Sequence, residues 1–201
     1  MISAIVLAAG LSTRMGHPKL ILPWGSTTVI GQVVNTLAHA QVDDIVVVTG
    51  AARTEVEAAL VKGRWDTVRT VFNPRYAVDN MLISLQAGIA ALGKQVDAML
   101  VVLGDQPQIE VGVVRLLTDS YRTEGYPLIV PSFHMRRGHP WVVARALWPD
   151  LLSAPVGSTM RDFLHAHTGQ ITYIAVSSPS ILRDLDTPED YARDNVASQL
   201  E

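Results

Sequence analysis

A buried strand that runs directly into a basic, glycine-containing loop restricts the fold of this chain more than any other feature. Residues 1–9 read MISAIVLAA, an apolar run typical of a strand covered on both faces. The following loop contains Gly10 and Gly16, which allow tight turns with bare N–H groups, and Arg14 and Lys19, which add positive charge. Because open α/β sheets bind ligands outside the carboxyl ends of their strands, this loop predicts a site for a nucleoside triphosphate or another polyphosphate. A plain turn with two solvated cations is the alternative.

The spacing of the loop excludes two common phosphate-binding motifs. A Walker A loop has a lysine directly after its second glycine, whereas His17 and Pro18 follow Gly16 here. Pro18 also disfavours a helical conformation at His17. The dinucleotide fingerprint requires a third glycine in register, which this loop lacks. The loop therefore belongs to neither class.

The composition sets outer limits on the kind of protein. A length of 201 residues with 48% hydrophobic side chains suits one α/β domain, so we expect a single domain over 1–201. The net charge of −3 argues against a general nucleic-acid surface. Zero cysteines exclude disulfides and thiolate metal sites and fit a reducing compartment. No apolar run approaches the ~20 residues of a membrane span. We therefore expect a cytoplasmic protein without nucleic-acid or membrane partners.

Apolar runs alternate with stretches of helical periodicity along the first half. Between the runs, apolar side chains recur at helical spacing, as at 29, 33, 34 and 37 or at 82, 85, 89 and 92. Alternating strands and helices predict an α/β fold with a mostly parallel, right-handed, doubly wound sheet. The expected strands of this half are 3–8, 44–49, 67–72 and 98–103.

The second half has a more varied pattern. A polar, loop-like stretch is expected at 133–139, with strands at 128–131, 141–144 and 171–176. Helices are expected at 111–121, 145–152, 159–165 and 189–199. The sequence contains no repeat and no linker, so this half reads as a lobe of the same domain.

Acidic residues stand at two positions where a metal site is chemically reasonable. Asp105 follows the apolar run 98–103, and Mg²⁺ is usually held by one or two carboxylates together with substrate phosphates. A helix N-cap would explain Asp105 equally well. Further on, Asp184 and Asp186 would share one side of a short strand. A helix capped by Thr187 would explain that segment without any metal.

Residues 7–25 (LAAGLSTRMGHPKLILPWG) resemble the signature of nucleotidyltransferases related to molybdenum cofactor cytidylyl- and guanylyltransferases. Their pattern runs Leu-Ala-(Ala or Gly)-Gly-x-Ser-x-Arg-Met-Gly-x-x-Lys, then Leu and Pro-x-Gly, and every fixed position has a counterpart here. The resemblance implies a Rossmann-like three-layer α/β/α fold of the nucleotide-diphospho-sugar transferase type. It also implies a nucleotide-binding half at about 1–107 and an acceptor-binding half at about 108–201.

The resemblance implies Mg-dependent transfer of CMP from CTP to the phosphate of the molybdenum–molybdopterin cofactor, with release of pyrophosphate. It makes Arg14, Lys19 and Asp105 catalytic, because Gly104-Asp105-Gln106-Pro107 resembles the family's metal motif. The closing Asp-x-Asp-Thr-Pro-Glu-Asp pattern adds Asp186 as the second metal ligand. The implied nucleotide-binding residues are Leu7, Ala8, Ala9, Gly10, Ser12, Arg14, Lys19, Asn73, Ser84 and Gly104.

The identity of the base and of the acceptor depends on two further motifs. An Ala-Ala-Gly start, here at 8–10, accompanies cytidylyl transfer, and the methyl group of Ala9 would crowd a purine more than glycine would. We therefore expect CTP, with GTP as the alternative. Arg-Gly-His-Pro resembles the acceptor-side motif of the cytidylyl branch, although His139 could instead be a loop histidine with a backbone partner. The implied acceptor-binding residues are Gln106, Pro107, Arg137, Gly138, His139 and Pro140.

This sequence departs from the family pattern at two places. The run of hydroxyl side chains after Met81 is reduced to Ser84, because residues 82–83 are Leu-Ile. A cap or a spectator role at the helix start would also explain Ser84. The family's Gly-Asp-x-Gly-Ala-Arg segment is Gly-Ser-Thr-Met-Arg at 157–161.

The resemblance also implies contact with a recipient molybdoenzyme or its chaperone. Other readings are guanylyl transfer to the same pterin, nucleotidyl transfer to another small phosphate, and a non-catalytic nucleotide sensor or cofactor chaperone. Arg14, Lys19, Asp105 and Asp186 are all retained. Because binding alone tolerates the loss of a metal carboxylate, their joint presence favours the enzyme.

Overall fold

One eight-stranded sheet contains strands from both halves of the chain. The computed structural model describes residues 1–78 and 80–198. The strand order is β10-β7-β9-β6-β1-β4-β5, and β8 pairs with β7. β1 lies parallel to β4 and β6, whereas β9 runs antiparallel to both β6 and β7. The strands are β1 (Ile2–Ala8), β4 (Asp44–Thr49), β5 (Val68–Phe72), β6 (Ala98–Leu103), β7 (Leu128–Phe133), β8 (Arg136–Arg137), β9 (Trp141–Ala144) and β10 (Ile171–Ala175).

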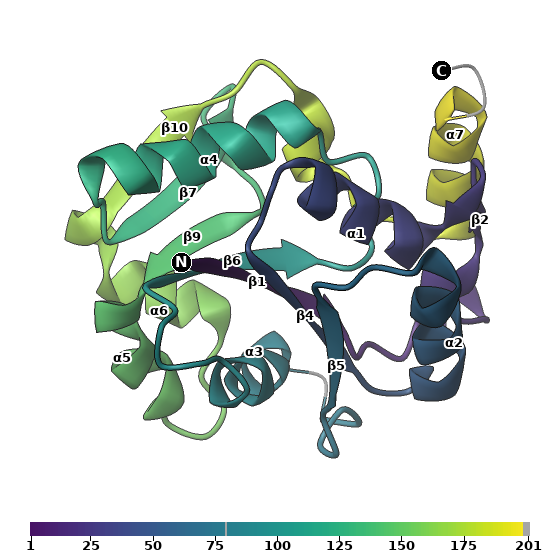
Figure 1. Cartoon of the computed structure of the whole chain (residues 1–201), viewed down its shortest axis with the longest axis horizontal. Coiled ribbons are helices and arrows are strands. Elements are labelled where there is room, and N and C mark those ends of the chain that lie inside the picture. Colours follow the sequence, from purple (N-terminus) through teal and green to yellow (C-terminus); the bar gives the residue numbers. More distant parts are fainter. Residues whose placement is uncertain (79, 199–201) are drawn as a thin grey trace.

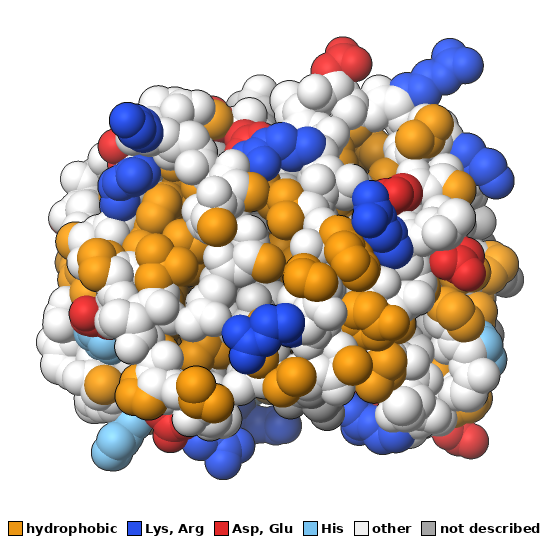
Figure 2. Space-filling view, turned by 90° about the horizontal axis from the view of Figure 1, so that it is seen from below, with side chains coloured by type: hydrophobic (Ala, Val, Ile, Leu, Met, Phe, Trp, Pro, Cys, Tyr) orange, Lys and Arg blue, Asp and Glu red, His pale blue; other side chains and the backbone are white. Residues whose placement is uncertain are grey.

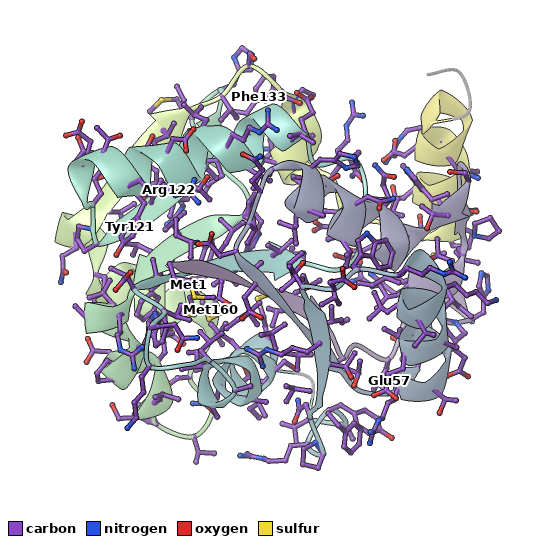
Figure 3. The ribbon with its side chains drawn as sticks, in the orientation of Figure 1. Met1, Glu57, Tyr121, Arg122, Phe133 and Met160 are labelled. Carbon is purple, nitrogen blue, oxygen red and sulfur yellow. The ribbon has the colours of Figure 1, made fainter. Side chains whose placement is uncertain are left out.

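Helices cover both faces of this sheet, which gives three layers (Figure 1). α1 (Val29–His39), α2 (Arg53–Gly63) and α4 (Val111–Glu124) contribute to one hydrophobic cluster, and α3 (Met81–Ala90), α5 (Trp148–Leu152) and α6 (Met160–Ala166) to the other. In Figure 3, Tyr121 of α4 and Met160 of α6 lie on opposite sides of the sheet. The three-layer α/β/α fold with a mostly parallel sheet is confirmed.

The strand β1 shows why both layers form. Ala4 and Val6 belong to the first cluster and Ile5 to the second, because successive side chains of a strand point to opposite faces. All three are fully buried. A strand covered on both sides needs apolar residues at every position, which explains the continuous runs in the sequence.

Most expected elements are present within one or two residues of their predicted ends, but two expectations and one alternative, the helix cap at Asp105, are wrong. The stretch 133–139 is not all loop: Phe133 ends β7 and Arg136–Arg137 form β8, which pairs back onto β7. Residues 183–186 form no strand. Helix α4 begins after Glu110, so Asp105 does not cap it.

Side-chain caps fix the starts of the helices that border the site. Thr28 accepts a hydrogen bond from Gly31 N at 3.2 Å and starts α1 after a small hairpin of β2 (Pro23–Trp24) and β3 (Thr27–Thr28). Asn80 accepts from Leu82 N at 2.9 Å and starts α3. Thr187 and Asp190 exchange hydrogen bonds at the start of α7 (Pro188–Ser198), as the capped-helix reading predicts.

The outer surface mixes chemical types on the side that lies at the bottom of Figure 1. Figure 2 shows hydrophobic side chains there between separate Lys and Arg side chains. Within the described residues, no helix combines the length and the apolar character needed to cross a membrane.

Candidate active site

A cleft of about 420 Å³ opens at the carboxyl ends of β1 and β6. The loop after β1 forms one wall, the start of α3 a second, and the segment before α7 a third. This position is the one expected for a ligand of an open α/β sheet. The lining residues are Leu7, Ala8, Ala9, Gly10, Leu11, Ser12, Thr13, Arg14, Lys19, Leu20, Tyr76, Val78, Asn80, Met81, Ser84, Leu103, Asp105, Asp184 and Asp186.

Lys19 joins two acidic residues that are distant in sequence. Its Nζ lies 2.5 Å from Asp105 Oδ2 and 3.2 Å from Asp186 Oδ1. Arg14 Nη1 lies 2.8 Å from Asp186 Oδ2. The side chain of Lys19 is only 14% exposed and that of Arg14 is 68% exposed, so Lys19 forms the inner part of the cluster and Arg14 its rim.

The charges of this cluster are balanced. Burial alone would lower the pKa of Lys19, but Asp105 and Asp186 outweigh burial and raise it above its usual value. Asp184 lies in the same cleft, and burial together with repulsion from Asp105 raises the pKa of its carboxyl. Lys19 is therefore fully charged, and the acidic groups compete for the positive charge near them.

Asp184 is the acidic residue that the sequence analysis did not assign to the site. Its Oδ1 accepts a hydrogen bond from Gln106 Nε2 at 2.6 Å. Gln106 is 2% exposed, and its Oε1 has no partner among the described residues. The sequence feature that could have assigned Asp184 to the site is the Asp-x-Asp spacing of Asp184 and Asp186. The backbone of the segment is held by Leu185 N, which donates to Asp105 O at 3.1 Å.

The donor set suits a hard divalent cation. Asp105, Asp184 and Asp186 all face one cleft, and a cationic Nζ already lies between two of their carboxylates. Within 1–78 and 80–198, no three acidic, histidine or cysteine side chains come close enough to hold a metal by themselves. A cleft that offers carboxylates but no complete set of protein ligands fits Mg²⁺ or a similar ion, because such ions complete their coordination with substrate phosphates and water.

The loop after β1 is arranged to approach an anion. Ser12 has a left-handed φ of 53° and Gly16 a φ of 72°, so the chain turns twice within a few residues. Ser12 Oγ accepts a hydrogen bond from Lys19 N at 3.4 Å, which ties the two ends of the loop together. No atom outside its neighbours lies within 4 Å of where a Cβ of Gly10 would stand, so this backbone is open to a ligand.

The predicted residues of the base side are organised around Asn73. Asn73 is buried, and its Nδ2 donates to Ser84 Oγ at 3.1 Å. Its Oδ1 accepts from Arg75 N at 2.9 Å, which shapes the loop that carries Tyr76. Ser84 lines the cleft, and Asn80 rather than Ser84 caps α3. Asn73 itself does not line the cleft, and its hydrogen bond holds the side chain of Ser84, so its direct contact with a nucleotide stays a prediction.

Gly104 serves the packing of the sheet. A Cβ at this position would stand 2.9 Å from Leu7 O, on the backbone of β1. Gly104 does not line the cleft, although it lies directly before Asp105. Its direct contact with a nucleotide stays a prediction, while its closeness to β1 explains how Asp105 reaches the cleft edge.

The predicted acceptor residues divide into buried and exposed members. Pro107, Gly138 and Pro140 are buried, and Arg137 is exposed. A Cβ at Gly138 would stand 2.1 Å from Ile181 O, so this glycine permits the close contact with the segment before α7. Of these four residues, only Arg137 is exposed to solvent. The acceptor roles of all four stay predictions.

His139 has a protected imidazole. Its ring stacks on Trp141 with centroids 4.4 Å apart, and its Nε2 is buried without a partner among the described residues. Burial lowers the pKa of His139 to about 4, so the ring is neutral at physiological pH. The main-chain N–H of His139 donates to Ile181 O at 3.1 Å.

A family model, the MobA-like NTP transferase domain, matches residues 4–171. The chain belongs to this family. It is therefore a nucleotidyltransferase.

Individual relatives cover nearly the whole chain. The molybdenum cofactor cytidylyltransferase of Escherichia coli (strain K12) is 29% identical over 94% of this chain and 93% of its own length. The nicotine blue oxidoreductase of Paenarthrobacter nicotinovorans is 30% identical over 96% and 95%. Among solved structures, Rv0371c of Mycobacterium tuberculosis H37Rv has a TM-score of 0.84 at 27% identity, covering 97% of both chains.

Proposed function

We propose that this MobA-like protein transfers CMP from CTP to the phosphate of a molybdenum–molybdopterin cofactor and releases pyrophosphate. The observation that carries the proposal is the cluster of Arg14 and Lys19, from the loop after β1, with Asp105 and Asp186. Two carboxylates and two cations at a polyphosphate loop are the groups that phosphoryl transfer requires. The similarity to a molybdenum cofactor cytidylyltransferase supports the choice of acceptor.

In the proposed reaction, an oxygen of the acceptor phosphate attacks the α-phosphorus of CTP in line. The bond from that phosphorus to the bridging oxygen breaks, and pyrophosphate leaves. Arg14, Lys19 and the loop amides bind the departing phosphates. No general base is required, because the attacking phosphate is already an anion.

Asp105 and Asp186 would hold a divalent metal, for which we propose Mg²⁺. When bound, the metal neutralises charge on the phosphates. A relative, Rv0371c, has been solved as a complex with manganese, at a TM-score of 0.76 and 26% identity over 96% of both chains. Asp184 lines the same cleft, but the three carboxylates do not form a complete metal site by themselves within the described residues.

The choice of CTP over GTP depends on Ala9. Ala9 lines the cleft, and its methyl group would restrict a purine more than hydrogen would. Guanylyl transfer to the same acceptor is the second candidate within the enzyme class. A nucleotide sensor would tolerate the loss of one metal carboxylate, so the joint presence of Asp105 and Asp186 favours turnover. One similar protein is named an oxidoreductase, but Asp105 and Asp186 favour group transfer in this chain.

The proposal extends to organisation and location. We place nucleotide binding in residues 1–107 and acceptor binding in 108–201 of one domain, with a recipient molybdoenzyme or its chaperone as partner. The absence of cysteine fits a reducing cytoplasm.

Thermal unfolding with Mg²⁺ and each of CTP, GTP, ATP and UTP tests the nucleotide part without an acceptor. A ligand at ~100 times its dissociation constant stabilises the folded state by about 2.7 kcal/mol. Stabilisation by CTP above the other three is the expected result. Preferential stabilisation by GTP would replace CTP in the proposal, and stabilisation by none of the four would contradict it.

A further inference from the structure

A second hollow, of about 660 Å³, lies at the same edge of the sheet as the nucleotide cleft. Its walls come from the end of β7, from β8, from α6 and from β10. β7 runs in the same direction as β6, because both are antiparallel to β9. Ser132 of β7 therefore lies at the carboxyl edge, as Leu103 of β6 does, and these two residues line the second hollow and the first cleft respectively.

Basic side chains dominate the second hollow. Arg137, Arg161 and His165 line it, against one acidic residue, Asp162. The carboxylate of Asp162 already accepts hydrogen bonds of 2.8 Å from both N and Oγ1 of Thr159. In the described part of the chain, neither arginine side chain has an ion-pair or hydrogen-bond partner. Two unpaired guanidinium groups in one concave site suit an anion.

The same hollow offers apolar surface beside the arginines. The Tyr173 side chain is 49% exposed, and Met135 is 96% exposed on the turn between β7 and β8. An exposed phenol ring and a flexible thioether are surfaces on which a flat ring can lie. The combination with Arg137 and Arg161 therefore selects a planar ligand that carries negative charge.

The start of β9 separates the two sites. β9 lies between β6 and β7 in the sheet, and His139 directly precedes it with Pro140. The His139 Nε2 is buried and has no hydrogen-bond partner among the described residues, and His139 lines neither the nucleotide cleft nor the second hollow.

We propose that the second hollow binds the body of the acceptor, a planar anionic heterocycle whose phosphate extends toward Asp105. Arg137 and Arg161 bind its negative charge, and Tyr173 contacts its ring. The chemical class of this ligand follows from the residues that line the hollow, while its role as the acceptor rests on the proposed function.

The probe for the test is pterin-6-carboxylate, a fluorescent planar anion, bound to the full chain without any nucleotide. Wild-type protein should bind it, and Arg137→Ala and Arg161→Ala should each weaken binding at least roughly tenfold, about 1.4 kcal/mol. Arg136→Ala is the matched control, because Arg136 is exposed on the same strand but does not line the hollow. Failure of the wild-type protein to bind, or equal affinity in all four proteins, would overturn the proposal.

A second measurement separates this inference from the proposed function. Thermal stabilisation by CTP and Mg²⁺ should be the same in wild type, Arg137→Ala and Arg161→Ala. If pterin-6-carboxylate binds through both arginines but no nucleotide stabilises the protein, the hollow is retained and the transferase proposal fails. If CTP stabilises all three proteins and neither arginine substitution changes the affinity for pterin-6-carboxylate, the transferase proposal is retained and the proposed role of the second hollow is rejected.

Discussion

Lys19 Nζ lies 2.5 Å from the carboxylate of Asp105, although 86 residues separate them in the chain. The contact joins the loop after β1 to the end of β6, which are neighbours in the sheet. Because Lys19 also reaches Asp186, one side chain neutralises two carboxylates that we assign to a metal. Any metal that binds there competes with this ammonium group, and the competition can be measured.

Removing Lys19 should strengthen the response to Mg²⁺ alone. In Lys19→Met the carboxylates of Asp105 and Asp186 lose their shared cation, so the variant should unfold at a lower temperature without metal. Mg²⁺ should then raise its unfolding temperature by roughly twice as much as in wild type, because no ammonium is displaced. Lys62→Met on α2, outside the cleft, is the control. An identical Mg²⁺ response in wild type and Lys19→Met would show that Lys19 and the metal do not share a site.

Removing Asp105 should separate turnover from nucleotide affinity. We expect Asp105→Ala to lower kcat on the order of 100-fold or more, because a carboxylate for the metal is lost. Its affinity for CTP should change much less, since Arg14, Lys19 and the loop amides remain. Asp119→Ala on α4, whose ion pair with Arg122 is exposed, serves as the control. Kinetics alongside a binding titration decide: an equal loss in both quantities would mean that Asp105 only binds nucleotide.

Gly138 should tolerate no side chain. Alanine there would place a Cβ 2.1 Å from Ile181 O, and the backbone must move to relieve the contact. We expect Gly138→Ala to lower the free energy of unfolding by about 3 kcal/mol. Gly112→Ala on α4 has open space and should be neutral or stabilising by up to about 1 kcal/mol. Urea denaturation of both variants checks the pair, and equal stabilities would refute the close contact.

His139 should make the protein less stable in acid. Its pKa is about 4 in the folded state against 6.5 when exposed, so the unfolded chain binds the proton more readily. The penalty starts as pH falls below 6.5, reaches about 2 kcal/mol by pH 5, and saturates below pH 4. The glutamine of His139→Gln does not titrate. Between pH 7 and pH 5 the free energy of unfolding of this variant should therefore fall by about 2 kcal/mol less than that of the wild-type protein. Parallel losses in both proteins would place His139 in contact with water.

The strands of the sheet were predictable where burial on both faces leaves a continuous apolar run. Residues 44–49, 98–103 and 141–144 were predicted with their observed ends for this reason. β8 was missed because two exposed arginines carry no such pattern, and only pairing with β7 makes them a strand.

The site was predictable where its residues follow one strand in sequence, as in the loop after β1. The position of Asp184 was not, because its orientation depends on Gln106, 78 residues away. Arg137 was predicted to bind the acceptor, but the hollow that it forms with Arg161 was not predicted, for a similar reason. Arg137 and Arg161 come from β8 and α6, and only the fold brings them together.

Product analysis after incubation with Mg²⁺, a molybdenum–molybdopterin acceptor and either CTP or GTP tests the central claim most directly. We predict a CMP adduct of the acceptor with one pyrophosphate released per adduct, and a slower or absent reaction with GTP. The Asp105→Ala variant under the same conditions should yield neither product at a comparable rate. Absence of adduct and of pyrophosphate with both nucleotides, from protein that unfolds cooperatively and binds CTP, would contradict the proposed transfer.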